Sequence, residues 1–118
     1  MNRLRHSLEL ISIHIPKTAG TSFQHVLEIN YPGALLRLDF EIIRNPDGQS
    51  TLLARNDTDP AFLKELHQSG KLSSNIRAVH GHFTYRDISE LFDLHQDVKI
   101  VTWLRDPVER IISNYNYL

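Results

Sequence analysis

Two stretches of the chain share one construction, and this construction restricts the fold more than any other feature of the sequence. In each stretch a short apolar run leads into a polar turn, and the turn leads into a segment with helical spacing. The first contains HIPKTAGTSF, residues 14–23, and the second contains TWLRDPVERIISNY, residues 102–115. Short runs rich in Leu, Ile and Val are typical of buried strands. Strands that alternate with helices predict crossover connections, and therefore an α/β fold with a mainly parallel sheet.

Turn and capping residues delimit the remaining elements. Asp59, Pro60 and Gly70 have the positions of an N-cap, a first helical residue and a C-terminal glycine. Residues 34–43 are apolar without a clear period, and the Asn-Pro-Asp-Gly run at 45–48 predicts a turn. We expect strands over residues 8–15, 75–80 and 98–104, and helices over residues 23–30, 60–69, 87–92 and 107–115.

Composition limits the partners that the chain can have. At 118 residues it is one domain or part of one, and a net charge of -1 gives no global attraction to nucleic acid or to an anionic membrane. The absence of cysteine excludes disulfides and thiolate metal sites, and it fits a reducing compartment. The first apolar run is too short to span a bilayer and is interrupted by Glu9, Ser12 and His14. We therefore expect a cytoplasmic protein without a membrane span, in which any anion site is local.

The turn over residues 16–22 has the composition of a phosphate-binding loop. Helix N-termini attract anions, and in parallel α/β sheets ligands lie beyond the carboxyl ends of the strands. Gly20 allows the backbone to approach an anion, Lys17 adds a charge, and hydroxyl donors come from Thr18, Thr21 and Ser22. The order is not that of a Walker A loop, because the lysine precedes the glycine. The alternative is a helix start that simply carries capping residues.

The second stretch offers another place for an anion. Arg105 stands at the end of the expected strand, and Ser113 lies about two helical turns further on. Together they could hold a second anionic group. The alternative is that Arg105 pairs with Asp106 or Glu109.

Both stretches together resemble a known family. HIPKTAGTS resembles the 5′-phosphosulfate-binding loop of sulfotransferases that use 3′-phosphoadenosine 5′-phosphosulfate (PAPS), and WLRDPVERIISNY resembles their 3′-phosphate-binding strand and helix. The amino-acid sequences of the two motifs are similar to those of the carbohydrate (Golgi-type) sulfotransferases and their bacterial relatives. Between them VHGHF, residues 79–83, is similar to the His-Gly-His segment of the uronyl and heparan sulfate 2-O-sulfotransferase branch.

This resemblance implies a P-loop NTPase-like three-layer fold and transfer of a sulfuryl group from PAPS to a hydroxyl, with a carbohydrate as the expected acceptor. Lys17 would contact the oxygen that bridges phosphate and sulfate, and His82 would take the proton from the acceptor. The 3′-phosphate would lie on Arg105 and Ser113. No metal is implied, and the product would be 3′-phosphoadenosine 5′-phosphate (PAP). The 5′-phosphosulfate would be bound by Lys17, Thr18, Ala19, Gly20, Thr21 and Ser22.

The choice of base lies between two histidines. Alternation along the strand would send His80 and His82 to the same side, and the family pattern favours His82. We expect His14 to be a structural residue within its strand. Tyr85 and Arg86 could touch substrate but are expected to be ordinary surface residues. The spacing of the other histidines predicts no metal site.

The chain departs from the family pattern in two respects. Ala19 stands where the loop often has a glycine, and little sequence follows the second motif. We therefore expect residues 1–118 to be the N-terminal portion of a single sulfotransferase domain with an incomplete sheet, whose edges favour a homo-oligomer. Two alternatives stay open: a truncated or non-catalytic protein that binds PAPS or PAP, and a P-loop-type kinase. The missing Walker A order and the lack of an obvious magnesium-binding aspartate argue against the kinase.

Overall fold

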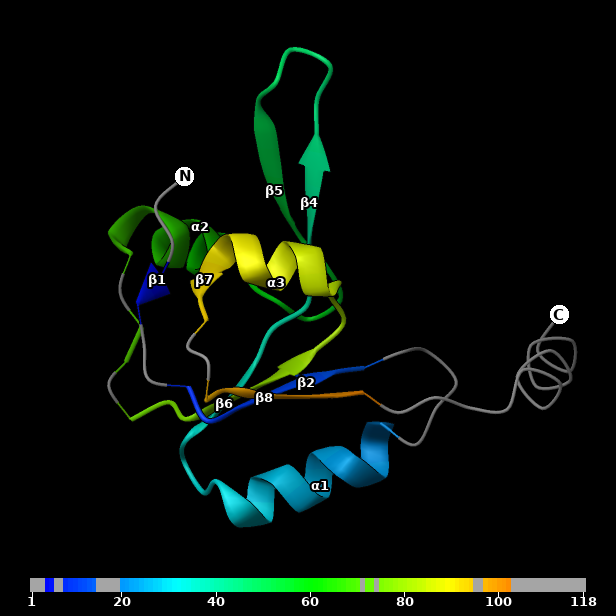
Figure 1. The fold of residues 1–118 in the computed structure, drawn as a ribbon, viewed down its shortest axis with the longest axis vertical. Coiled ribbons are helices and arrows are strands. Elements are labelled where there is room, and N and C mark those ends of the chain that lie inside the picture. Colours follow the sequence, from blue (N-terminus) through cyan, green and yellow to red (C-terminus); the bar gives the residue numbers. More distant parts are fainter. Residues whose placement is uncertain are drawn as a thin grey trace, which may run out of the picture.

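A four-stranded parallel sheet forms the centre of the chain in a computed structural model that describes residues 4–5, 8–14, 20–70, 72–73, 75–94 and 97–102. Its strand order is β3-β6-β2-β8, and each neighbouring pair is parallel (Figure 1). The strands are β2 (Leu10–Ile13), β3 (Leu35–Arg37), β6 (Ala78–Gly81) and β8 (Lys99–Thr102). The predicted α/β class and the parallel sheet are confirmed.

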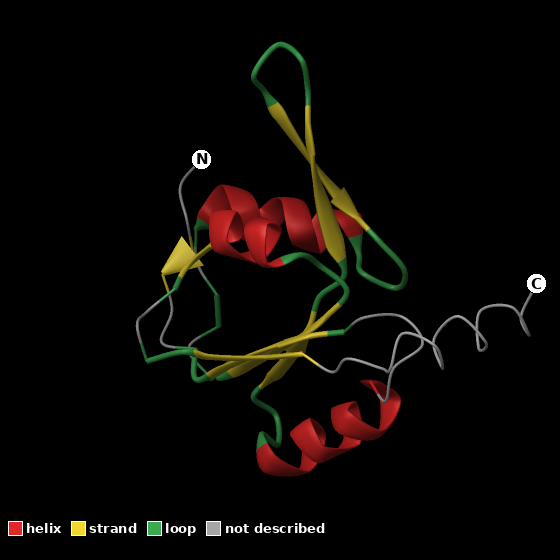
Figure 2. Ribbon diagram, turned by 45° about the vertical axis from the view of Figure 1, so that its right-hand side comes forward, coloured by secondary structure: helices red, strands yellow, loops and turns green. Residues whose placement is uncertain are grey.

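Helices cover both faces of this sheet, so the fold has three layers. Helix α1 (Gly20–Asn30) lies on one face, and α2 (Pro60–Ser69) and α3 (Tyr85–Leu91) lie on the other (Figure 2). Successive side chains of β2 pack on opposite faces of the sheet. Leu10 packs with Leu27 of α1, whereas Ile11 belongs to the core on the other face. A strand that is buried on both faces reads as a continuous apolar run, which is why β2 was recognisable in the sequence.

An antiparallel hairpin projects from the three layers (Figure 1). It consists of β4 (Phe40–Arg44) and β5 (Ser50–Ala54), and the predicted turn at 45–48 connects them with Gly48 at φ 86°. A backbone angle of this sign favours glycine. The prediction of a turn is confirmed, but neither strand of the hairpin was predicted.

The helix boundaries follow their capping residues. Asp59 Oδ1 accepts a hydrogen bond from the amide of Ala61 at 3.0 Å, and Gly70 adopts φ 65° after the last turn of α2, as predicted. Helix α3 begins earlier than the predicted residue 87, because the Thr84 hydroxyl accepts from the Asp87 amide at 3.0 Å and caps the helix.

Other boundaries differ from the predictions by a few residues. Within the described residues, β2 covers 10–13 of the predicted range 8–15, β6 covers 78–81 where 75–80 was predicted, and β8 begins at residue 99 where 98 was predicted. Residues 15, 103 and 104 of the predicted ranges lie outside the described residues. Phe92, which we expected in a helix, begins β7 (Phe92–Asp93), which pairs in parallel with β1 (Leu4–Arg5). The predicted last helix lies outside the described residues. None of the helices in the described part of the chain has the length and apolar character needed to cross a membrane.

Candidate functional site

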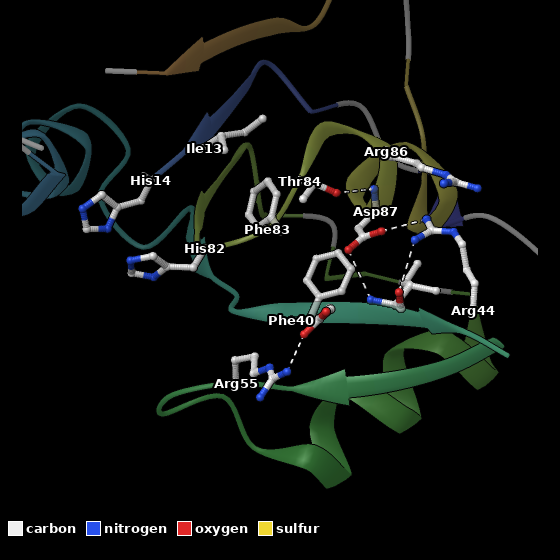
Figure 3. Close-up of a pocket in the computed structure, with 12 residues that line it drawn as sticks. Ile13, His14, Phe40, Arg44, Arg55, His82, Phe83, Thr84, Arg86 and Asp87 are labelled. Atoms are coloured by element: carbon white, nitrogen blue, oxygen red, sulfur yellow. Dashed lines mark hydrogen bonds and ion pairs between the residues drawn. The ribbon is translucent and has the colours of Figure 1, made fainter. Parts of the chain in front are cut away.

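The carboxyl ends of β2 and β6 bring two histidines together. Because these strands are parallel neighbours, the residues that follow them emerge at the same edge of the sheet. The amide of His14 donates to the carbonyl oxygen of Gly81 at 2.8 Å, which sets His14 beside His82. The centroids of the two rings are 4.2 Å apart, and the labelled rings lie next to one another in Figure 3.

His82 is paired with a buried carboxylate. Its Nδ1 lies 3.0 Å from Oδ1 of Asp39, and its backbone amide donates to the same oxygen at 2.6 Å. The Asp39 residue is only 1% exposed, whereas the side chain of His82 is 29% exposed. Burial by itself would raise the pKa of Asp39, but hydrogen bonds from the backbone and ring of His82 and from Asn56 lower it below its ordinary value. The carboxyl group is therefore ionised at neutral pH.

His80 has a different environment. It is 2% exposed, and its Nδ1 lies 2.8 Å from the hydroxyl oxygen of Ser12 on the neighbouring strand. Burial, followed by the proximity of His14, lowers the pKa of His80 to about 4, so its ring is neutral near pH 7. The ring of His14 is stacked with that of His80 at 5.6 Å and also contacts that of His82, in agreement with the predicted alternation. The rings of the two histidines of VHGHF thus lie on the same side of the strand, but His80 is buried and His82 is partly exposed.

A pocket of about 630 Å³ opens beside His14 and His82. It runs from these rings over Phe40 and Phe83 toward the hairpin and α3 (Figure 3). The residues that line it are Ile13, His14, Phe40, Glu41, Ile42, Arg44, Arg55, His82, Phe83, Thr84, Arg86 and Asp87. The pocket therefore combines an apolar floor, two imidazoles and a charged rim.

The arginines of the rim are all paired with carboxylates. Arg44 contacts Asp87 at 2.8 Å and Glu90 at 2.9 Å. Arg86 lies 3.5 Å from the same Glu90, and Arg55 pairs with Glu41. Arg86 and Tyr85 are both exposed, as expected; Arg86 also lines the pocket, whereas Tyr85 is not part of the lining. The positive charge of the rim is thus largely compensated by Glu41 and Asp87, which line the pocket, and by Glu90, which lies outside the lining.

Most residues predicted to bind the donor lie outside the described residues. These are Lys17, Thr18, Ala19, Arg105 and Ser113. Gly20 is the first residue of α1, which Thr21 and Ser22 continue, so this helix begins within the predicted loop at 16–22 and three residues before its predicted start at residue 23. The assignment of these residues as a binding site stays a prediction. Among the residues that the structure describes, no group of three potential ligands of the His, Cys, Asp or Glu type could hold a metal ion.

Two residues of the site were not predicted. His14 was expected inside a strand, but β2 ends at Ile13 and the ring of His14 reaches the pocket instead. Asp39 was overlooked because it lies in the aperiodic stretch at 34–43. The signal for it was present in the sequence: a lone carboxylate between Leu38 and Phe40 must find partners if the stretch is buried.

Comparison with known proteins agrees with the resemblance found in the sequence. A search of curated proteins returns no match for the chain. The model of the sulfotransferase family, in contrast, matches residues 4–117, which include the loop at 16–22, the VHGHF segment and the stretch at 102–115. Since this match covers nearly all of the 118 residues, the chain belongs to the sulfotransferase family.

Proposed function

We propose that the chain transfers a sulfuryl group from PAPS to a hydroxyl group of a carbohydrate, with His82 as the general base. Membership of the sulfotransferase family supports sulfuryl transfer in general. The donor, the class of acceptor and the role of His82 are the parts that we propose. Three further predictions stay beside it: a cytoplasmic location, self-association, and the assignment of residues 1–118 to the N-terminal portion of a single sulfotransferase domain.

The observation that carries this proposal is the position of His82. Its ring lies in the pocket at the carboxyl edge of the sheet, in contact with the ring of His14. His14 is followed in the chain, after Ile15, by the phosphate-type loop at 16–22. His82 therefore lies at the edge of the sheet from which the chain enters this loop. Sheets of α/β proteins bind anionic ligands at this edge.

His82 is better suited to the role than His80. A base must reach the hydroxyl proton directly or through one water molecule. His82 is partly exposed in the pocket, whereas His80 is buried and bonded to Ser12. This difference supports the family pattern in which the second histidine of the segment is the base.

The proposed reaction is an in-line transfer between oxygens. His82 Nε2 takes the proton of the acceptor hydroxyl while the acceptor oxygen forms a bond to sulfur. The bond between sulfur and the bridging oxygen breaks, its electron pair stays on the 5′-phosphate, and PAP leaves. Lys17 would neutralise the charge that develops on that phosphate. Positioning and charge stabilisation supply most of the catalysis, as in phosphoryl transfer.

Transfer of radioactive sulfate from labelled PAPS to a panel of neutral and uronate-containing oligosaccharides tests the proposal. The wild-type chain should label at least one of them. His82→Ala should lower kcat by at least about 100-fold and leave PAP affinity unchanged, because a general base contributes roughly 10² to 10⁴ in rate. Full activity of the His82→Ala chain would refute the role of His82. A wild-type chain that binds PAP but labels no hydroxyl would favour the non-catalytic alternative.

A further inference from the structure

Asp39 and His82 form a pair whose geometry specifies where the ring proton lies. A single carboxylate oxygen, Oδ1, faces both the backbone amide and Nδ1 of His82, at 2.6 and 3.0 Å. An ionised carboxylate can only accept, so the Nδ1 of His82 must carry a hydrogen for this contact to be favourable. In the neutral ring the other nitrogen, Nε2, is then free of a proton.

The segment that carries Asp39 is held firmly against the end of β6. The amide of Leu38 donates to the carbonyl of His80 at 3.0 Å, and the amide of Phe40 donates to the carbonyl of His82 at 3.2 Å. Asp39 itself is fastened on its other side, where its amide donates to the Thr58 hydroxyl at 2.8 Å. The backbone that carries the carboxylate is therefore held on one side by β6 and on the other by the Thr58 hydroxyl and by the amide of Arg55, which donates to the Asp39 carbonyl at 2.9 Å.

The glycine between the two histidines makes this approach possible. A Cβ atom at Gly81 would lie 1.8 Å from the carbonyl oxygen of Leu38 and 2.9 Å from Oδ1 of Asp39. Both distances are too short for any side chain, so a larger residue would push the carboxylate away from His82. The glycine in the middle of the His-Gly-His segment is thus explained by the Leu38 carbonyl and, less closely, by the Asp39 carboxylate beside it.

We propose that Asp39 is a positioning residue for His82: it holds the tautomer in which Nε2 accepts a proton, and it stabilises the imidazolium formed when the acceptor hydroxyl is deprotonated. The second part rests on the proposed function. Because Asp39 is shielded from water, its charge acts on the ring more strongly than a surface carboxylate would. The ring of His14 packs against His82 within the pocket and helps to restrict the orientation of the ring.

The tautomer can be tested on the wild-type chain without donor or acceptor. Long-range ¹H–¹⁵N NMR of the chain labelled at histidine distinguishes protonated from unprotonated ring nitrogens. At a pH where the ring of His82 is neutral, we expect its Nδ1 to be protonated and its Nε2 to be unprotonated. The opposite tautomer, or an even mixture of the two, would overturn the proposal.

The catalytic part is tested with Asp39→Asn, which keeps the shape of the side chain and removes its charge. We expect kcat to fall about 100-fold with the KM of either substrate changed less than about threefold, a smaller loss than the roughly 10⁴ known for the buried aspartate of serine proteases. The control is Glu9→Gln, which removes the charge of a carboxylate that pairs with Arg77 and does not line the pocket. This control should leave the NMR signals of His82 in their wild-type positions.

The two readouts separate this inference from the proposed function. If the wild-type chain transfers sulfate and Asp39→Asn retains full kcat, Asp39 is not a positioning residue and the proposed function stands. If NMR shows the expected tautomer but PAPS supports no transfer to any acceptor, the proposed function fails while the assignment of the His82 tautomer stands. If the Asp39→Asn chain does not fold, the wild-type NMR measurement still decides the tautomer.

Discussion

Acidification from pH 7 to pH 5 should destabilise the fold through His80. Its pKa is lowered from 6.5 to about 4 by burial and by the neighbouring His14. In the unfolded chain His80 is therefore protonated below pH 6.5, whereas in the folded chain it is protonated only below about pH 4. The contribution of the neutral His80 ring to the free energy of unfolding is complete above pH 6.5 and is lost as the pH falls toward 4. Between pH 7 and pH 5 this linkage amounts to about 2 kcal/mol of unfolding free energy.

Urea unfolding followed by far-UV circular dichroism measures this loss at the two pH values. His80→Asn is the informative variant, because an amide near the position of Nδ1 can keep the bond to Ser12 but does not titrate. It should lose most of the pH dependence. His25→Asn changes an exposed histidine of α1 and should behave as the wild type does. Equal wild-type stability at both pH values, or an unchanged pH dependence in His80→Asn, would show that protonation of His80 is not linked to unfolding.

Three further substitutions test the packing that supports the site. Gly81→Ala should destabilise the chain by about 3 kcal/mol in urea unfolding, since its Cβ would meet the Leu38 carbonyl at 1.8 Å; wild-type stability would contradict the geometry of the Asp39 segment. Leu27→Ala should cost about 3 kcal/mol in the same assay, because Leu27 is the buried anchor of α1 on the sheet, and a loss below about 1 kcal/mol would mean that α1 packs otherwise. Asp59→Ala removes the cap of α2 and should cost about 1 kcal/mol, seen as a lower Tm, whereas an unchanged Tm would show that the cap is not needed.

The central strand and the helix caps were predictable because their signals are local. The apolar run of β2 reflects burial on both faces, and Asp59 and Gly70 act on neighbouring backbone groups of α2. Strands β3 and β4 escaped prediction because they follow each other with only Leu38 and Asp39 between them. Their separate patterns merge into one apolar stretch without a period.

The candidate site was predictable only in part, since its decisive contacts join distant parts of the chain. The sequence suggested His82 through the VHGHF segment, and it suggested that His80 would face the same side. It did not indicate that β6 ends at Gly81, which leaves His80 inside the sheet and His82 in the pocket. Asp39 and His82 are 43 residues apart, and no local pattern predicts a contact over that separation.

Calorimetric titration of the chain with PAP tests directly whether this chain has a site for the sulfuryl donor. We expect binding that requires the 3′-phosphate, so that 5′-AMP binds far more weakly. Binding should also weaken in Arg105→Ala and in Lys17→Ala. ATP with magnesium serves as the control for a kinase. A folded chain that binds no PAP, or that prefers magnesium-ATP, would contradict the assignment of a PAPS-dependent sulfotransferase site to this chain.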